Sequence, residues 1–304
     1  MWENIQIFGF RALWSPYYFI AILSIAVLYV TVVRGRFMDK FTDATPATRK
    51  QMTRFLGAMA LLYIVKGSPL DLLGHMNFSF HMVQMSLLYL AIPPLLILGT
   101  PDWLLRAIVN TKGINQIFKL FSKPLLALFL FNGSFSMYHF PGVFDFIKTD
   151  SLLHAAVTGL IFIFAFFMWI PLIAPLPEYD RMSDLFKMGY LFANGLLLSP
   201  ACALIIFSNS PLYATYYDPE HWVQALALCV PASLLNGIDV SNINLFSFTS
   251  LQKDQQLGGI IMKIVQEIIY GMTLGYVFFR WVRNEKIRGE EEVAKYMTPQ
   301  PSDS

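Results

Sequence analysis

Histidine and methionine side chains near the ends of several apolar segments have the spacing of a metal site. His81 and Met85 are four residues apart, which places both side chains on one face of a helix. His139 ends another apolar segment and His154 begins the next one. Imidazole with thioether is a donor set suited to copper, particularly Cu(I), because soft sulfur favours the soft ion. We therefore expect His81, His139 and His154 to bind copper transiently, with Met85 and Met262 assisting.

Ionisable side chains in the last apolar segment form a second candidate group. Asp254 lies at its start, and Lys263 and Glu267 lie within it. Ionisable residues inside a membrane span are costly, so they indicate function by default. We expect Glu267 to face the helix bundle and to be paired or protonated. An ion pair with Lys263 is the structural interpretation, and a proton or ion path is the functional one.

The elements that position these residues are transmembrane helices. The 304 residues are 56% hydrophobic and only 14% charged, whereas about 25% charged residues is usual for soluble domains. Backbone polar groups in lipid must be satisfied within the segment, so apolar stretches of this length predict helices. The sequence thus predicts an all-α integral membrane protein, a seven-transmembrane helix bundle. The predicted spans are 16–33, 54–73, 78–98, 124–140, 152–174, 186–207 and 256–281.

The orientation follows from the distribution of lysine and arginine, which are retained on the cytoplasmic side. With seven spans, 17 of the 22 basic residues fall on one side, and Arg11, Lys148 and Lys253 fall on the other. We expect the amino terminus outside and the carboxyl terminus in the cytoplasm. All five histidines then lie at the outer ends of their helices: His75, His81, His139, His154 and His221. Taken singly, each has a structural alternative, because histidines are tolerated at interfaces and methionines commonly fill packing gaps.

Four further details of the chain complete the prediction. Pro93 and Pro94 should bend or end the third helix. In the long outer connection 208–255, the apolar stretch 222–238 is expected to be re-entrant or interfacial, because a crossing there would invert the last helix. We expect the tail 284–304 to be disordered. Cys202 and Cys229 form no CxxC pair, so a disulfide between them stays open.

Composition and motifs exclude several functions. The net charge of +2 is too small to suggest nucleic-acid binding, and the basic residues follow the loops rather than one face. The chain shows no nucleotide-binding loop, nucleophile elbow or HExxH motif. We therefore predict a protein that is not an enzyme and whose main solvent is the lipid bilayer.

Several motifs resemble one known family when they are taken together. The run His81-Met82-Val83-Gln84-Met85, followed by Pro93-Pro94 and Gly99-Thr100-Pro101, resembles the third-helix signature of the CtaG family of cytochrome c oxidase assembly factors from Bacillus-type bacteria. Similar stretches follow in the same order: Tyr138-His139-Phe140-Pro141 with Asp145, Leu153-His154, Trp169-Ile170-Pro171, Leu212-Tyr213 and 254–262. The resemblance covers about residues 75 to 265.

The resemblance implies a seven-helix protein of the bacterial plasma membrane that helps assemble a caa-type cytochrome c oxidase. Its partners would be oxidase subunits, and its role would be chaperone-like assistance in copper delivery or insertion. This chain departs from the family pattern at two positions. Many members carry histidine where it has Met85 and where it has Thr158, so the site is poorer in histidine here.

Three alternatives to copper delivery remain open. A copper or proton-coupled transporter would use Lys263 and Glu267 and would need ligands near the cytoplasmic ends of the helices. A haem-binding cytochrome would use histidines as axial ligands, usually deeper in the bundle. A metal-free scaffold would hold oxidase subunits without any cofactor.

Overall fold

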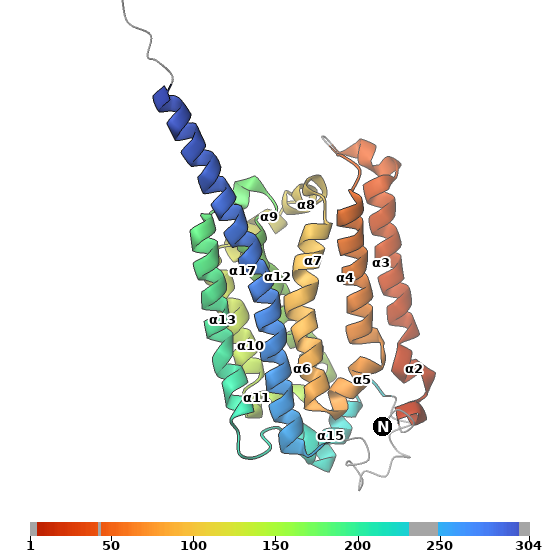
Figure 1. The fold of residues 1–304 in the computed structure, drawn as a ribbon. Coiled ribbons are helices and arrows are strands. Elements are labelled where there is room, and N and C mark those ends of the chain that lie inside the picture. Colours follow the sequence, from red (N-terminus) through yellow and green to blue (C-terminus); the bar gives the residue numbers. More distant parts are fainter. Residues whose placement is uncertain (1–4, 42–43, 231–248, 298–304) are drawn as a thin grey trace, which may run out of the picture.

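The computed structural model describes residues 5–41, 44–230 and 249–297, and every regular element in these ranges is a helix (Figure 1). The α-helices are α2 Gly9–Trp14, α3 Pro16–Arg34, α4 Arg49–Gly67, α5 Pro69–Met76, α6 Phe78–Ser86, α7 Ile92–Gly99, α8 Asp102–Val109, α9 Ile114–Phe121, α10 Pro124–Tyr138, α11 Pro141–Lys148, α12 Ser151–Ile173, α13 Asp184–Ile206, α14 Ala214–Tyr217, α15 Pro219–Leu226 and α17 Leu251–Met297. Shorter turns are η1 Gln6–Phe8, η2 Arg36–Lys40, the π-helical η3 Leu87–Ala91 and η4 Pro177–Tyr179.

Several of these helices are long and apolar enough to cross a membrane. Among the described residues there are five, or up to seven if each of two bent pairs is one span. The bent pairs are α4 with α5, at 46°, and α9 with α10, at 83°. The single segments are Gln6–Arg34, Phe78–Gly99, Ser151–Ile173, Asp184–Ile206 and Leu251–Ala294. The chain therefore has the helices of a multi-pass membrane protein, and the predicted number of seven is the upper end of this range.

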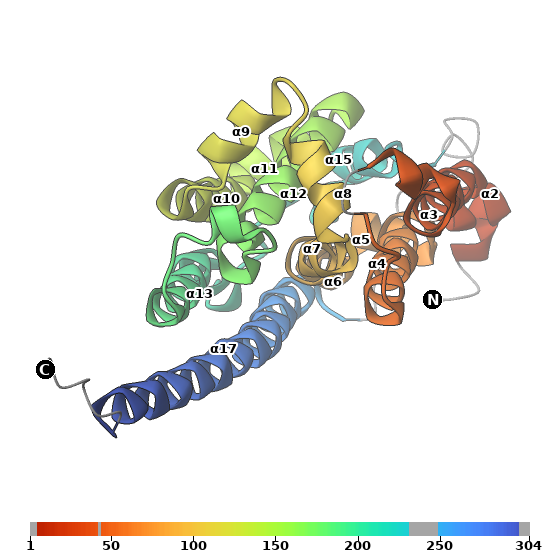
Figure 2. The same cartoon turned by 90° about the horizontal axis from the view of Figure 1, so that it is seen from above.

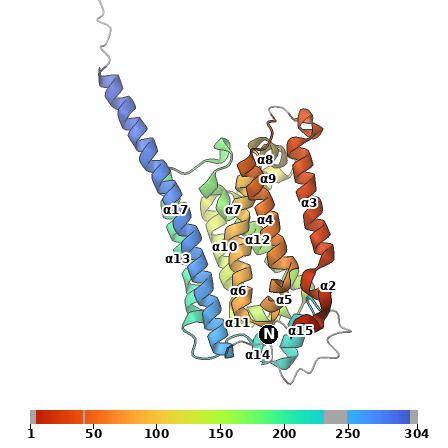
Figure 3. The same ribbon diagram turned by 45° about the vertical axis from the view of Figure 1, so that its right-hand side comes forward.

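The long helices run side by side, and short helices lie across both ends of the bundle (Figures 1 and 3). One end, called the α11 end below, is formed by α5, α11, α14 and α15, and the opposite end carries α8 and α9. Seen from above, α6 and α7 lie between α4 and α17 (Figure 2). In an apolar 18-residue stretch of Phe78–Gly99, 61% of the residues are buried, against 17% in the corresponding stretch of Gln6–Arg34. The segment that carries His81 is thus the centre of the bundle.

The third span contains two prolines but does not end at them. We expected Pro93 and Pro94 to bend or end the helix. It does not end there: a π-helical turn, Leu87–Ala91, lies directly before the two prolines, and α7 continues to Gly99. Proline lacks an N–H, so Pro93 leaves the carbonyl four residues earlier without its helical donor. That carbonyl, of Tyr89, accepts a hydrogen bond from the indole nitrogen of Trp169 at 3.2 Å. A neighbouring helix therefore replaces the missing bond.

The last helix is longer than predicted. We expected it to end at residue 281 and residues 284–304 to be disordered, but α17 continues to Met297. The extension is rich in glutamate and lysine and has an Arg288–Glu285 ion pair at 3.0 Å one turn apart. Such residues favour helix even when no other helix packs against them. Residues 298–304 lie outside the described residues, as does the part of the predicted re-entrant stretch beyond residue 230.

Candidate metal site

Four of the five histidines gather at the α11 end of the bundle. His75 belongs to α5, His81 to α6, His139 caps the carboxyl end of α10, and His154 lies in the first turn of α12. Each is less than 9% exposed. The rings form two close pairs, His81 with His139 at 5.8 Å between centroids and His75 with His154 at 5.7 Å. Residues far apart in the chain thus form one buried imidazole cluster.

The His81–His139 pair presents two free ring nitrogens. Nδ1 of His139 lies 2.8 Å from the carbonyl oxygen of Phe135, which can only accept, so this nitrogen carries the proton. The lone pair of His139 is therefore on Nε2. Within the described part of the chain, Nε2 of His81 and Nε2 of His139 are both buried and lack a hydrogen-bond partner. Buried polar atoms are rarely left unpaired, and a metal ion is one explanation for such atoms.

Tyr138 connects the two pairs, and Lys148 contacts one of them. The Tyr138 ring lies 5.9 Å from that of His81, and its hydroxyl lies 3.5 Å from Nδ1 of His154. Lys148 at the end of α11 is 1% exposed, and its Nζ lies 3.1 Å from Nδ1 of His75. Burial, reinforced by the charge of Lys66, lowers the pKa of Lys148 to about 7. The cluster therefore contains an amine that changes charge near neutral pH.

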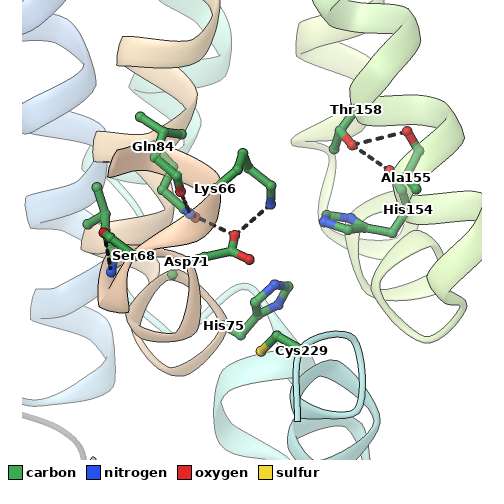
Figure 4. Close-up of polar contacts among 12 residues, drawn as sticks. Lys66, Ser68, Asp71, His75, Gln84, His154, Ala155, Thr158 and Cys229 are labelled. Atoms are coloured by element: carbon green, nitrogen blue, oxygen red, sulfur yellow. Dashed lines mark hydrogen bonds and ion pairs between the residues drawn. The ribbon is translucent and has the colours of Figure 1, made fainter. Parts of the chain in front are cut away.

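A cleft leads from the surface to the His75–His154 pair (Figure 4). It has a volume of about 460 Å³, and its lining includes both histidines together with Lys66, Asp71 and Thr158. Nζ of Lys66 is 2.5 Å from the Asp71 carboxylate. The Thr158 hydroxyl donates to the carbonyl of His154 at 2.7 Å, on its own helix. Its hydroxyl hydrogen therefore does not face the cleft.

The glutamine of the third-helix motif contacts Asp71, one of the residues that line this cleft. The amide nitrogen of Gln84 donates to the Asp71 carboxylate at 3.0 Å and to the carbonyl of Val65 at 2.7 Å. Its oxygen lies 2.0 Å from the position that a Cβ on Gly74 would take, so a side chain there would displace the Gln84 amide from these bonds. Gln84 thereby joins α6 to both halves of the bent α4–α5 pair.

Asp254 anchors the helix that carries His81. Its carboxylate, 4% exposed, accepts hydrogen bonds from the N–H of Phe78 at 2.6 Å and from the Ser79 hydroxyl at 2.5 Å. Negative charge is stabilised at a helix amino terminus. Gly258, one turn along α17, lets the two helices approach, because a Cβ there would lie 2.7 Å from the Phe78 ring. Asp254 therefore has a structural role in joining α17 to α6, and a functional role stays a prediction.

A second set of contacts holds the segment after α13 over the site. The Asp145 carboxylate accepts from the backbone N–H groups of Ala214 and Thr215 at 3.0 and 2.9 Å. The Tyr213 hydroxyl donates to the carbonyl of His139 at 2.8 Å. Asp145 and Tyr213, which belong to the motifs of the sequence analysis, therefore bond to backbone groups around the site rather than to a ring nitrogen of the cluster.

The predicted thioether ligands are buried, but the structure does not by itself define a complete metal site. Met85 is 2% and Met262 0% exposed, and both belong to the main apolar core. Across residues 5–41, 44–230 and 249–297, no group of three or more His, Cys, Asp or Glu side chains is placed to hold a metal ion. Metal binding by His81, Met85, His139 and the other predicted ligands therefore stays a prediction.

The second predicted group lies away from the histidines. Lys263 and Glu267 form an ion pair at 2.7 Å, but the Glu267 side chain is 63% exposed, so the expectation that it faces the bundle is wrong. Gln266 and Tyr270 occupy the inward face of α17 instead, at 0% and 5% exposure. The helical period assigns these neighbours to the core and turns Glu267 outward.

Sequence reasoning missed three members of the cluster. His75 was recognised only as one histidine among five, Lys148 only as a basic residue of an outer loop, and Tyr138 only as part of a motif. The signal for Lys148 is its position in an outer connection that is otherwise almost free of positive charge. No local pattern indicates that its amine reaches His75, because the two are 73 positions apart.

Comparison with known proteins supports the resemblance of the motifs. The model of the family described as cytochrome c oxidase caa3 assembly factor (Caa3_CtaG) matches residues 26–284. Uncharacterized proteins of Mycobacterium bovis and Mycobacterium tuberculosis are each 23% identical over 257 residues, which covers 78% of this chain and 34% of theirs. The chain thus spans about a third of the length of these curated relatives. No solved structure matches the chain significantly. Because the family match covers most of the chain and all of the histidine cluster, the protein belongs to the cytochrome c oxidase caa3 assembly factor family.

Proposed function

We propose that the protein assists assembly of a caa3-type oxidase by holding Cu(I) between His81 and His139 and passing it to an oxidase subunit. The observation that carries this proposal is the pair of buried Nε2 atoms without hydrogen-bond partners in the described chain. The protein acts by binding and transfer, without catalysing a reaction. Family membership supports the oxidase as the partner.

The spacing of the rings agrees with one bridging ion. With metal–nitrogen bonds of about 2 Å and Nε2 about 1.2 Å from the ring centroid, two imidazoles on one ion have centroids up to about 6.4 Å apart. The observed 5.8 Å for His81 and His139 falls within that limit. Met85, one turn after His81, supplies a soft third donor, and Met262 completes the set if it turns toward the ion. Few ligands suit a site that must release its ion.

The cleft between α5 and α12 supports an access route. It opens at the surface and its lining includes His154, whose Nδ1 lies 3.5 Å from the Tyr138 hydroxyl, and the Tyr138 ring lies 5.9 Å from that of His81. An ion entering along this path meets His154 first and the His81–His139 pair second. His154 is therefore assigned to the same copper path as the other two predicted ligands.

The proposal places the α11 end outside the plasma membrane, with seven spans and the carboxyl terminus in the cytoplasm. It rests on the excess of lysine and arginine at the opposite end of the helices. Cysteine labelling from outside whole cells tests it: Glu220→Cys at the α11 end should react with an impermeant maleimide and Lys112→Cys should not. The reverse pattern would overturn the orientation.

Competition with a chromophoric Cu(I) chelator tests the metal site on the full chain in detergent. His81→Ala and His139→Ala should each weaken Cu(I) binding by at least about tenfold, since even groups that only support a metal ligand contribute that much. His221→Ala is the matched control, because His221 lies in α15, outside the cluster, with its Nδ1 hydrogen-bonded to the Asp218 carboxylate at 3.0 Å. Equal affinity in all three variants would eliminate the site.

Oxidase maturation separates copper delivery from a metal-free scaffold. Cells without the protein should make oxidase poor in copper, and the double variant His81→Ala/His139→Ala should not restore it. His154→Ala should restore it only partly. Full restoration of oxidase copper by the double variant would leave the scaffold as the function.

A further inference from the structure

One face of α17 carries a regular ridge that nothing in the described chain covers. Its members are spaced by four residues and are Lys263, Glu267, Gly271 and Gly275, called the α17 ridge below. Lys263 is 32% and Glu267 63% exposed in their side chains. A Cβ added to either glycine would meet nothing within 4 Å. The ridge is therefore open, although α17 packs against α6 and α13 on its other sides (Figure 2).

The ridge lies within the apolar part of α17. Its exposed neighbours on the helix are apolar: Ile260, Ile264, Ile268 and Met272. An ion pair at this depth faces lipid in a single copy, where ionisable groups are costly and normally face protein or a water-filled cavity. The charges of Lys263 and Glu267 thus indicate that protein covers the ridge.

Unpaired polar atoms border the charged half of the ridge. A groove of about 270 Å³ runs between α13 and α17, and its lining includes Ser199, Lys263, Gln266 and Tyr270. Both amide atoms of Gln266 and the Tyr270 hydroxyl are buried, and among the described residues they have no hydrogen-bond partner. Lys263 already donates to the Ser199 hydroxyl at 2.9 Å. The groove therefore offers donors and an acceptor to an incoming polar side chain.

Gly271 and Gly275 are not required for packing within one copy of the protein. Glycine in a helix interior is destabilising, and here it makes no close approach to another helix of the same chain. Two glycines four residues apart on an exposed face of a membrane helix are the pattern by which two such helices pack at short distance. Gly271 and Gly275 therefore indicate a helix as the covering element rather than a small molecule.

We propose that the α17 ridge binds the same ridge of a second copy, forming a parallel dimer about a two-fold axis along the membrane normal. Both copies insert in the same direction, so their α17 helices are parallel. In that arrangement equivalent residues of the two copies lie at the same level, and Lys263 of each copy reaches Glu267 of the other across one helical turn, so the ridge supplies its own complementary charges. A different partner would need one basic and one acidic side chain four residues apart on its own helix. The second copy's Glu267 also brings a carboxylate toward Gln266 and Tyr270.

Disulfide cross-linking tests the contact in the full chain. In a background with Cys202→Ser and Cys229→Ser, Gly271→Cys should give a cross-linked dimer in native membranes. Gly133→Cys on α10 is the matched control, because Gly133 is also exposed and equally open. Cross-linking of Gly271→Cys no greater than that of the control would overturn the proposal, as would capture of other proteins only.

Charge exchange makes the test independent of misfolding. Lys263→Glu leaves the two ridges with only acidic charges, so the dimer dissociation constant should rise by about tenfold, measured by mass photometry in nanodiscs. The exchange Lys263→Glu/Glu267→Lys restores complementarity and should restore the dimer. The proposal would be overturned if the exchange variant does not dimerise while its monomer unfolds at the same temperature as the unmodified protein. It would also be overturned if the unmodified protein is monomeric.

Discussion

Asp254 and Ser79 are 175 positions apart, and the carboxylate of the first accepts a hydrogen bond from the hydroxyl of the second at 2.5 Å. The contact fixes the start of α17 to the start of α6, two residues before His81. The longest helix of the described chain therefore sets the position of a predicted copper ligand in its central helix. A substitution at Asp254 should affect the site without touching it.

Asp254→Asn should lower both stability and Cu(I) affinity. The amide keeps the shape of the side chain but loses the charge-assisted bonds to Ser79 and the α6 amino terminus, which corresponds to about 1–3 kcal/mol. The thermal unfolding midpoint in detergent and chelator competition measure the two effects. Asp218→Asn is the control, because Asp218 caps α15 at its Glu220 N–H with a side chain that is 42% exposed and should change neither strongly. Equal effects of the two variants would contradict the anchoring role.

Lys148 should make stability depend on pH above neutrality. Its pKa is about 7 in the folded protein and 10.5 ordinarily. Between these values the unfolded chain binds more protons, so the free energy of unfolding rises with pH, by at most about 1.4 kcal/mol per unit. Lys148→Met should remove this slope from unfolding midpoints measured between pH 7 and 10. The exposed variant Lys253→Met should keep it, and an unchanged slope in Lys148→Met would contradict the buried position.

The apolar helices were predictable because lipid allows few solutions. Runs of about 20 apolar residues predict spans directly, and the described helices overlap every predicted range. The gathering of His81, His139 and His154 at one end follows from the same segmentation, since each lies at the corresponding end of its span. The hydropathy pattern predicts the height of each histidine along the bundle axis. It does not predict which imidazole rings face each other.

Contacts between distant residues could not be predicted in this way. Nothing near Asp254 in the sequence indicates that it caps α6. The orientation of Glu267 was predicted wrongly because the prediction used its depth in the membrane and did not consider which face of the helix it occupies. The length of α17 was missed because hydropathy reports where a span ends rather than where a helix ends. The helix propensity of the charged extension decides that boundary.

Tyr213→Phe should weaken the metal site while leaving the core packed. The hydroxyl donates to the carbonyl of His139 at 2.8 Å, and the ring stacks on Phe78 with centroids 4.6 Å apart. Phenylalanine keeps the stacking and loses the bond, so the expected loss of stability is about 1 kcal/mol. Cu(I) affinity should fall by a few-fold at most. Tyr217→Phe, at an exposed position, should change neither quantity, and a larger effect there would contradict the assignment.

Met85 distinguishes a copper site from a packed core. Met85→Leu conserves volume, so it should cost less than about 1.5 kcal/mol in stability, yet it removes the only thioether one turn after His81. Met85→His should instead raise affinity for Cu(I) and extend binding to Zn²⁺, because imidazole serves both ions. Chelator competition with each metal measures both changes. Met59→Leu, buried on α4, controls for packing.

If Met85 only fills space, Met85→Leu will leave Cu(I) affinity unchanged, and Met85→His will destabilise the protein without improving binding. Opposite effects of the two variants on affinity therefore require an ion at the His81–His139 pair.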